Sequence, residues 1–106
     1  MAIEKNMSAE SLAIRTQRRT ILTALNQCYD VKLYIESVWL VVLFNEPSAE
    51  QTLFKRDILY LEMKGYVKIT EGLFMKGCPF LKRFIQLTAS GKEIAEETMK
   101  DPALEI

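Results

Sequence analysis

Residues 49–64 form the segment that narrows the possible folds furthest. Phe54, Ile58 and Leu61 follow one another at i, i+4 and i+7, which is the spacing of one face of an α-helix. Gly65 comes directly afterwards, and glycine commonly ends helices because it adopts a left-handed backbone conformation at little cost. We therefore predict a helix over residues 49–64 that buries one face and ends at Gly65.

A break precedes this helix. Pro47 interrupts the chain, and Ser48 and Gln51 have the spacing of a capping box, in which each side chain bonds the backbone N–H of the other residue. Residues 46–48 would then form a short turn between this helix and the segment before it.

Residues 38–45 allow two interpretations. The run from Val38 to Phe44 is the most apolar in the chain, but its seven residues are far fewer than the ~20 that span a bilayer. β-Branched and aromatic side chains dominate the run and favour a strand. Because a turn and a helix follow, we predict instead a short buried helix over residues 38–45, capped by Ser37.

The N-terminal region has a helical pattern. Ser8 can cap a helix that runs to about Gln27, with Ile21 and Leu25 on its apolar face. Residues 29–36 are rich in Tyr, Val and Ile, and form either a short strand or an irregular link.

The C-terminal half has the pattern of a hairpin followed by a helix. Residues 66–70 alternate as a strand does, residues 71–79 hold turn-forming glycine and proline, and residues 80–87 form a second strand. A last helix then runs to about Lys100.

These elements fit one domain. A chain of 106 residues has room for one hydrophobic core. The order is helix, link, helix, helix, two-stranded hairpin and helix, which predicts an α+β fold that is mainly α. We assign residues 8–100 to this domain, residues 1–7 to a flexible N-terminal arm and residues 101–106 to a C-terminal tail.

Composition removes several function classes. Histidine is absent and the two cysteines, Cys28 and Cys78, are isolated, so the usual ligands of a metal site are missing. No nucleotide-binding or catalytic motif occurs. We expect no enzyme activity, no metal and no cofactor. The N-terminus lacks the apolar core of a signal peptide, so we expect a cytoplasmic protein that does not contact membranes.

The charge is unevenly distributed. The net charge is zero, which argues mildly against nucleic-acid binding. Residues 51–83 nevertheless carry seven basic and three acidic side chains, whereas residues 84–106 carry two basic and five acidic ones. A section of net charge +4 therefore precedes a tail of net charge −3.

Two motifs resemble those of winged helix-turn-helix transcription regulators. In that superfamily the recognition helix ends in a pattern such as Leu-x-x-Leu-Glu-x-x-Gly-Leu-Val, which is matched here by Ile58, Leu61, Glu62, Gly65 and Val67. Residues 87–93 resemble the Leu-Thr-x-x-Gly motif that closes the wing and opens the last helix. The likeness covers about residues 18–100, and it implies a three-helix core, a hairpin wing (residues 66–87) and a C-terminal helix.

The chain also looks like small regulators of the arsenic-repressor type that Mu-like prophages carry. That similarity includes the start Arg18-Arg19-x-Ile21-Leu22. It implies a phage-encoded regulator of transcription. The metal ligands of arsenic repressors are not reproduced, so metal sensing is not part of the expectation.

The resemblance implies double-stranded DNA as the partner. Exposed side chains near the start of helix 49–64 would meet the major groove, and cations of the wing region would meet phosphates. The residues expected to contact DNA are Gln51, Thr52, Lys55, Arg56, Lys76, Lys82 and Arg83. A solvated helix face carries the same residue types, so ordinary surface polarity is the competing interpretation. Glu50 argues against DNA unless its carboxylate turns to cap the helix.

Other side chains leave further alternatives. Trp39 is either a core residue or the anchor of a homodimer, which would double the positive patch. The apolar residues of the wing region, Leu73, Phe74, Met75 and Phe80, point to the alternative function, a winged-helix protein-interaction module without DNA binding. The helix-1 arginines (Arg15, Arg18 and Arg19) touch phosphate or, in our preferred interpretation, pair with the acidic last helix (Glu93, Glu96 and Glu97).

Overall fold

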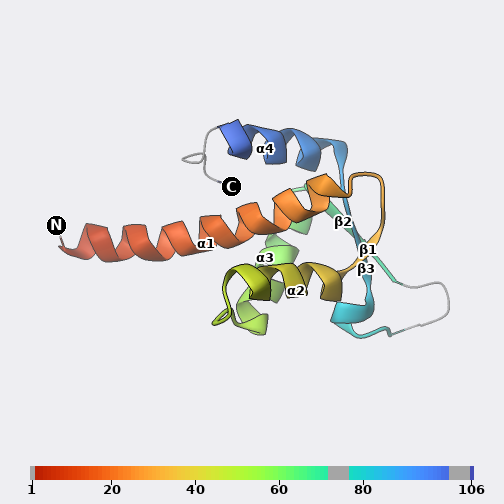
Figure 1. Cartoon of the computed structure of the whole chain (residues 1–106), viewed down its shortest axis with the longest axis horizontal. Helices are drawn as coiled ribbons and strands as arrows, with labels where there is room; N and C mark the ends of the chain where they lie inside the picture. Colours follow the sequence, from red (N-terminus) through yellow and green to blue (C-terminus); the bar gives the residue numbers. More distant parts are fainter. Residues whose placement is uncertain (1, 72–76, 101–105) are drawn as a thin grey trace.

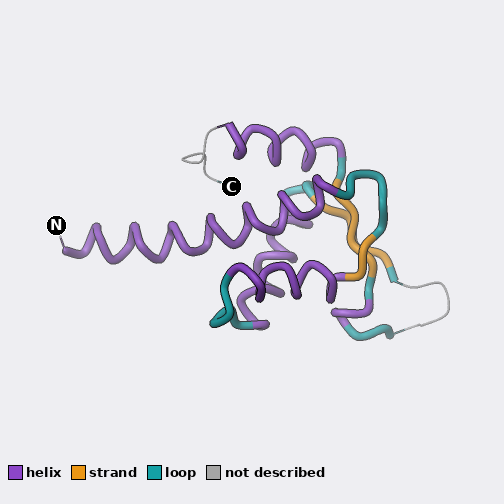
Figure 2. Tube along the Cα trace, in the orientation of Figure 1, coloured by secondary structure: helices purple, strands orange, loops and turns teal. Residues whose placement is uncertain are grey.

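The computed structural model describes residues 2–71, 77–100 and 106, with side chains from residue 13 onward. In chain order the elements are α1 (Ala2–Gln27), β1 (Leu33–Tyr34), α2 (Ile35–Asn45), α3 (Gln51–Met63), β2 (Val67–Thr70), the 3-10 turn η1 (Phe80–Lys82), β3 (Phe84–Leu87) and α4 (Ala89–Lys100). Figures 1 and 2 show the helices gathered beside the small sheet. The predicted α+β class, mainly helical, is confirmed. The expectations for Leu73, Phe74, Met75 and Lys76 lie outside the described residues.

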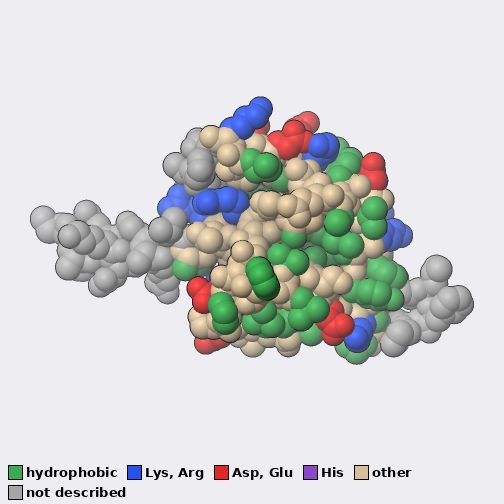
Figure 3. All heavy atoms as spheres, in the orientation of Figure 1, with side chains coloured by type: hydrophobic (Ala, Val, Ile, Leu, Met, Phe, Trp, Pro, Cys, Tyr) green, Lys and Arg blue, Asp and Glu red, His purple; other side chains and the backbone are tan. Residues whose placement is uncertain are grey.

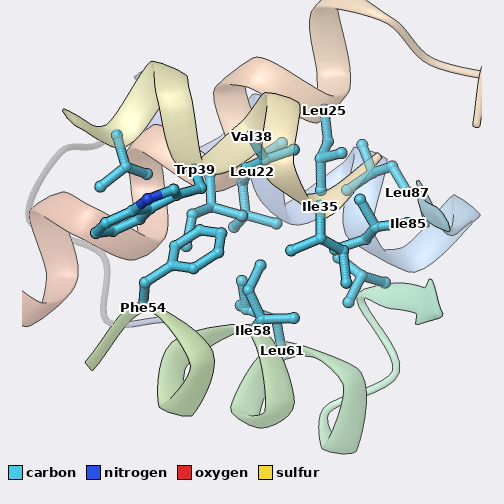
Figure 4. Close-up of a cluster of buried hydrophobic side chains, with 14 of the residues drawn as sticks. Leu22, Leu25, Ile35, Val38, Trp39, Phe54, Ile58, Leu61, Ile85 and Leu87 are labelled. Atoms are coloured by element: carbon cyan, nitrogen blue, oxygen red, sulfur yellow. The ribbon is translucent and has the colours of Figure 1, made fainter. Parts of the chain in front are cut away.

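One core joins the helices to the sheet. Figure 4 shows apolar side chains from α1, α2 and α3 converging, with the strands closing one end. The buried members include Ile21, Leu22 and Leu25 of α1, Ile35, Val38, Trp39 and Val42 of α2, Phe54, Ile58 and Leu61 of α3, Val67 of β2, Ile85 and Leu87 of β3, and Ala95 of α4. The predicted apolar stripe of α3 therefore faces the core as expected.

The prediction of a helix over residues 38–45 is confirmed, although α2 begins earlier, at Ile35. Its buried residues, Ile35, Val38, Trp39 and Val42, recur at i, i+3, i+4 and i+7. Burial on one helical face therefore overrides the strand propensity of the individual residues. Ser37 does not cap the helix, because the N-cap position is occupied by Tyr34, whose side chain makes no capping bond.

Helix α3 ends as predicted but begins differently. Gly65 has a φ of +80°, the left-handed conformation expected after the helix. The capping box is wrong: the N-cap is Glu50, and no side chain caps it. Ser48 instead donates from its hydroxyl (2.7 Å) and its backbone N–H (3.3 Å) to the carboxylate of Glu46. Glu46 therefore fixes the turn between α2 and α3.

The two-stranded hairpin is corrected to a three-stranded antiparallel sheet of order β1-β3-β2. Leu33 and Tyr34 pair with Ile85 and Phe84 of β3, so the link after α1 contains a short strand. The predicted strand 80–87 begins only at Phe84. Residues 80–82 form η1, where the N–H of Lys82 bonds the carbonyl of Pro79 at 2.9 Å. Residues 80–82 therefore bond within a local turn, and the pairing of this segment with a neighbouring strand begins at Phe84.

The two ends of the domain also differ from expectation. α1 begins at Ala2, so residues 2–7 are helical rather than a loose arm; this part of α1 runs beyond the other helices (Figure 1). α4 ends at Lys100 as predicted. Most of the tail lies outside the described residues, but Ile106 is buried in the core cluster.

Candidate nucleic-acid interface

The first two turns of α3 bring four of the predicted contact residues together. Gln51, Thr52, Lys55 and Arg56 are all exposed, at positions i, i+1, i+4 and i+5. They flank the outer side of the helix because the opposite side, which carries Phe54, is fixed in the core (Figure 4). All four side chains are exposed, as the helical pattern predicts.

The two cations of this group keep most of their contact with solvent. The Lys55 ammonium lies 5.2 Å from the centroid of the Phe80 ring, which places η1 beside the start of α3. Arg56 Nη2 lies 3.7 Å from a carboxylate oxygen of Asp57, and the Arg56 side chain remains 51% exposed. Both cations therefore remain accessible to an anionic partner.

The outer side of α3 becomes apolar further along the helix. Thr52, Arg56, Leu59 and Met63 lie at i, i+4, i+7 and i+11, which is one continuous stripe. Leu59 is 43% exposed and Met63 75% exposed. Neither residue was among the predicted contacts, although both lie off the Phe54/Ile58/Leu61 stripe that faces the core. The face thus combines a polar first half with an apolar second half.

The predicted phosphate contacts before β3 are already engaged within the chain. Lys82 bonds both carboxylate oxygens of Glu36, at 3.0 and 3.2 Å. Arg83 donates from Nε to the backbone carbonyl of Cys78 at 3.2 Å. The Lys82–Glu36 pair joins η1 to the start of α2 and offsets part of the positive charge that the hairpin was expected to present. At the start of α3, exposed positive charge is carried by Lys55 and Arg56.

A buried ionic cluster, which the sequence analysis did not identify, fastens α1 to α3. Asp57 is 1% exposed and accepts hydrogen bonds from Gln17 Nε2 at 2.6 Å and from Arg18 Nε at 3.1 Å. The Arg18 guanidinium also lies 3.7 Å from the centroid of the Tyr60 ring. Asp57 is three residues after Phe54, so helical spacing could have placed it on the buried face.

This cluster corrects the expected pairing for Arg18. Arg18 binds Asp57 rather than the acidic last helix, and it donates to the backbone oxygen of Ile106 at 3.0 Å. On α4, Glu96 instead bonds Lys92 of the same helix. Arg18 also borders a polar hollow of about 440 Å³ near Tyr66. Because Arg18 is held by Asp57 and Ile106, it is a structural residue.

Trp39 is a core residue, not the anchor of a dimer. It is 9% exposed, and its ring centroid lies 5.0 Å from that of Phe54. The exposed apolar side chains of α2 lie on another side of the helix. They are Leu40, Val41 and Phe44.

Two carboxylates border the turn before α3. The hydroxyl and N–H groups of Ser48 hold the pKa of Glu46 below its ordinary value of 4.5. Glu50 is exposed at the N-cap and makes no capping bond. The carboxylate of Glu50 therefore stays on the surface beside Gln51 and disfavours an anionic partner at that corner.

The described residues show neither a metal site nor a membrane helix. Within residues 2–71, 77–100 and 106, no three acidic or cysteine side chains are grouped so that they could hold a metal ion. In the same part of the chain, no helix has both the length and the apolar character needed to cross a membrane. Comparison of the sequence and the structure with models of protein families, with curated proteins and with solved structures finds no match.

Proposed function

We propose that this chain is a winged helix-turn-helix protein that binds double-stranded DNA and regulates transcription. The order of elements supports this: α2, a short turn and α3 are followed by the paired strands β2 and β3 and by α4. This order and the two motifs that resemble winged-helix regulators agree with each other. The separate likeness to small regulators of Mu-like prophages makes phage origin our expectation.

The observation that carries the proposal is the polar start of α3. A recognition helix needs one face fixed to a rigid core and the opposite face free for the major groove. Phe54 and Ile58 are completely buried, while Gln51, Thr52 and Arg56 are exposed. The side chains that would touch DNA therefore stand on a well-anchored helix.

Each exposed side chain has a plausible DNA partner. Arg56 can donate two hydrogen bonds to the major-groove edge of guanine. Gln51 can donate one hydrogen bond to N7 of adenine and accept one from its N6 amino group. Lys55 and Thr52 suit phosphate oxygens. The chain has no net charge and Lys82 is paired with Glu36. We therefore expect weak binding to unrelated sequences and a shallow dependence on salt.

A second candidate function is a winged-helix module that binds another protein and not DNA. The observation that favours it is the apolar half of the α3 stripe, with Leu59 43% and Met63 75% exposed. Charged and polar side chains suit the rim of a DNA contact, whereas exposed leucine and methionine suit a protein partner.

Fluorescence anisotropy with a labelled duplex of mixed sequence tests the proposal. The wild type and a Lys55→Ala/Arg56→Ala variant are compared at two salt concentrations. We expect salt-dependent binding by the wild type. Each lost phosphate contact lowers the slope of log affinity against log salt by about 1, so the variant should bind more weakly with a slope smaller by about 1 to 2.

The matched control is Lys32→Ala/Lys100→Ala, which removes the same charge from two exposed lysines outside α3. Its affinity should stay close to that of the wild type. If the wild type does not bind at low salt, or if both double variants weaken binding equally, the α3 interface is wrong. If the wild type does not bind DNA, a Leu59→Ser/Met63→Ser variant that loses a protein partner retained by the wild type would support the second candidate.

A further inference from the structure

We propose that the α1–α2 face is a self-association surface that binds a second copy of this chain. The α1–α2 face consists of the exposed side chains Leu40, Val41 and Phe44 of α2 and the uncharged side chains of α1 next to them. Leu40 is 59%, Val41 39% and Phe44 88% exposed. Positions i, i+1 and i+4 put the three on one side of α2. Figure 3 shows hydrophobic side chains gathered over this part of the molecule.

The neighbouring surface of α1 lacks large and charged side chains along one line. Small or uncharged residues recur at alternating steps of three and four, the spacing of a seam between helices. They are Ala13, Thr16, Thr20, Thr23 and Gln27. Two adjoining hollows of about 400 and 410 Å³ follow the line between α1 and α2, and both are bordered by Thr16, Thr20 and Asn45.

Charge favours an identical partner. In a two-fold symmetric dimer each surface meets its own copy, so a charged patch would repel itself. Among the described residues, one hollow is lined by a single charged side chain, Glu46, and the other by a single one of opposite sign, Arg19. The described lining of the α1–α2 face therefore carries little charge that could repel its own copy.

Shape points to the same partner. Phe44 borders one of the hollows and is 88% exposed, so a protruding ring stands beside a concave surface. A two-fold axis through this region places Phe44 of each copy over the hollow of the other. One interaction is thereby made twice, which is the property of a self-complementary interface.

The exposed apolar area of the α1–α2 face determines how tightly we expect two copies to bind. The exposed parts of Phe44, Leu40 and Val41 together amount to roughly 300 Å² of apolar surface, given that an aromatic side chain buries about 150–250 Å². Residues 13–27 of α1 add a strip ~21 Å long. The exposed apolar side chains of α2 alone supply less than half of the ~800 Å² per partner of a standard interface, so we expect a dimer that dissociates at micromolar concentration.

This inference does not depend on the proposed function. The buried stripe of α3 points toward α1 and α2 (Figure 4), so its exposed side chains point away from the α1–α2 face. Self-association and DNA contact therefore use separate surfaces and can be tested separately.

The test is the molar mass of the chain in solution, measured by sedimentation equilibrium from low to high micromolar concentration. We expect the mass to rise from that of one copy toward that of two. Phe44→Glu should raise the dissociation constant about 30-fold or more, as the loss of a central anchoring side chain does. Val41→Glu, on the same face, should act in the same direction.

The matched control is Met63→Glu, which changes a comparably exposed side chain on α3 and should leave the dissociation constant unchanged. Thermal unfolding confirms that the Phe44 variant folds. A wild type that stays monomeric at every concentration would overturn the proposal. So would a dimer that survives Phe44→Glu, or one that Met63→Glu weakens equally.

Discussion

Replacing Asp57 by alanine removes the acceptor that joins α1 to α3, and we expect it to be the most damaging single change to a polar residue. Asp57 is 1% exposed, and the Arg18 side chain that it binds at 3.1 Å is 14% exposed. Removing one partner of a buried ion pair costs about 3 to 5 kcal/mol, since the other charge is left without compensation. Arg18 keeps its contact with Tyr60 and its bond to Ile106. We therefore expect the lower end, about 3 kcal/mol.

A loss of that size is easily measured. It is a large fraction of the ~5 to 15 kcal/mol by which domains are stable, and it lowers the melting temperature by about 10 to 20 °C. Urea unfolding can be followed by the fluorescence of Trp39, the only tryptophan, which is buried against Phe54.

Two controls make the result specific. Glu62→Ala removes an exposed carboxylate from the same helix and should change the free energy of unfolding by less than about 0.5 kcal/mol. Arg18→Met combined with Asp57→Leu removes both charges and should recover much of the loss. If Asp57→Ala costs no more than Glu62→Ala, the cluster does not hold α1 on α3 and the reasoning is refuted.

Three further changes test the turns that surround the core. Gly91→Ala should lower the free energy of unfolding by about 1 to 3 kcal/mol, because a Cβ there would overlap the backbone carbonyl oxygen of Tyr66. A urea titration measures this loss, and a neutral effect would contradict the packing. Thr88→Ala should lower the free energy of unfolding by about 1 kcal/mol, because the Thr88 hydroxyl accepts a hydrogen bond from the Gly91 N–H at 3.0 Å. Thr88→Ser keeps a hydroxyl and should cost much less, so equal losses would argue against a capping role. In an NMR titration, the pKa of Glu46 should lie below 4.5, and Ser48→Ala should raise it. The stability that this turn contributes is complete above pH 4.5 and is lost as the pH falls through the lowered pKa of Glu46.

The helices were predictable because their signals are local. The α3 stripe and Gly65 lie within twelve residues of one another, and both keep their predicted roles. The α2 helix was the harder case, since Val38, Trp39 and Val42 favour a strand as single residues. Their spacing, rather than their propensities, matched the buried face of the structure.

The sheet and the ion pairs could not be predicted in the same way because they join distant residues. β1 has only two residues, and Leu33 pairs with Ile85, about 50 positions later. The bond from Lys82 to Glu36 spans a similar separation. The periodicity of α3 predicted which of its side chains are exposed. Which cations remain free to bind a partner depends on long-range pairs such as the one between Lys82 and Glu36. Asp57 was the exception, since its helical position placed it on the buried face.

The strand order has a consequence for the order of folding. β3 lies between β1 and β2, so neither edge strand has a hydrogen-bonded neighbour in the sheet until residues 84–87 are in place. On the ribosome, α1, α2 and α3 emerge well before β3 does. During that interval the helices lack Ile85 and Leu87, and the backbone groups of β1 and β2 remain unpaired. The last fifth of the chain therefore completes the sheet, and a chain that stalls before residue 84 would expose two strand edges and an unfinished core to aggregation.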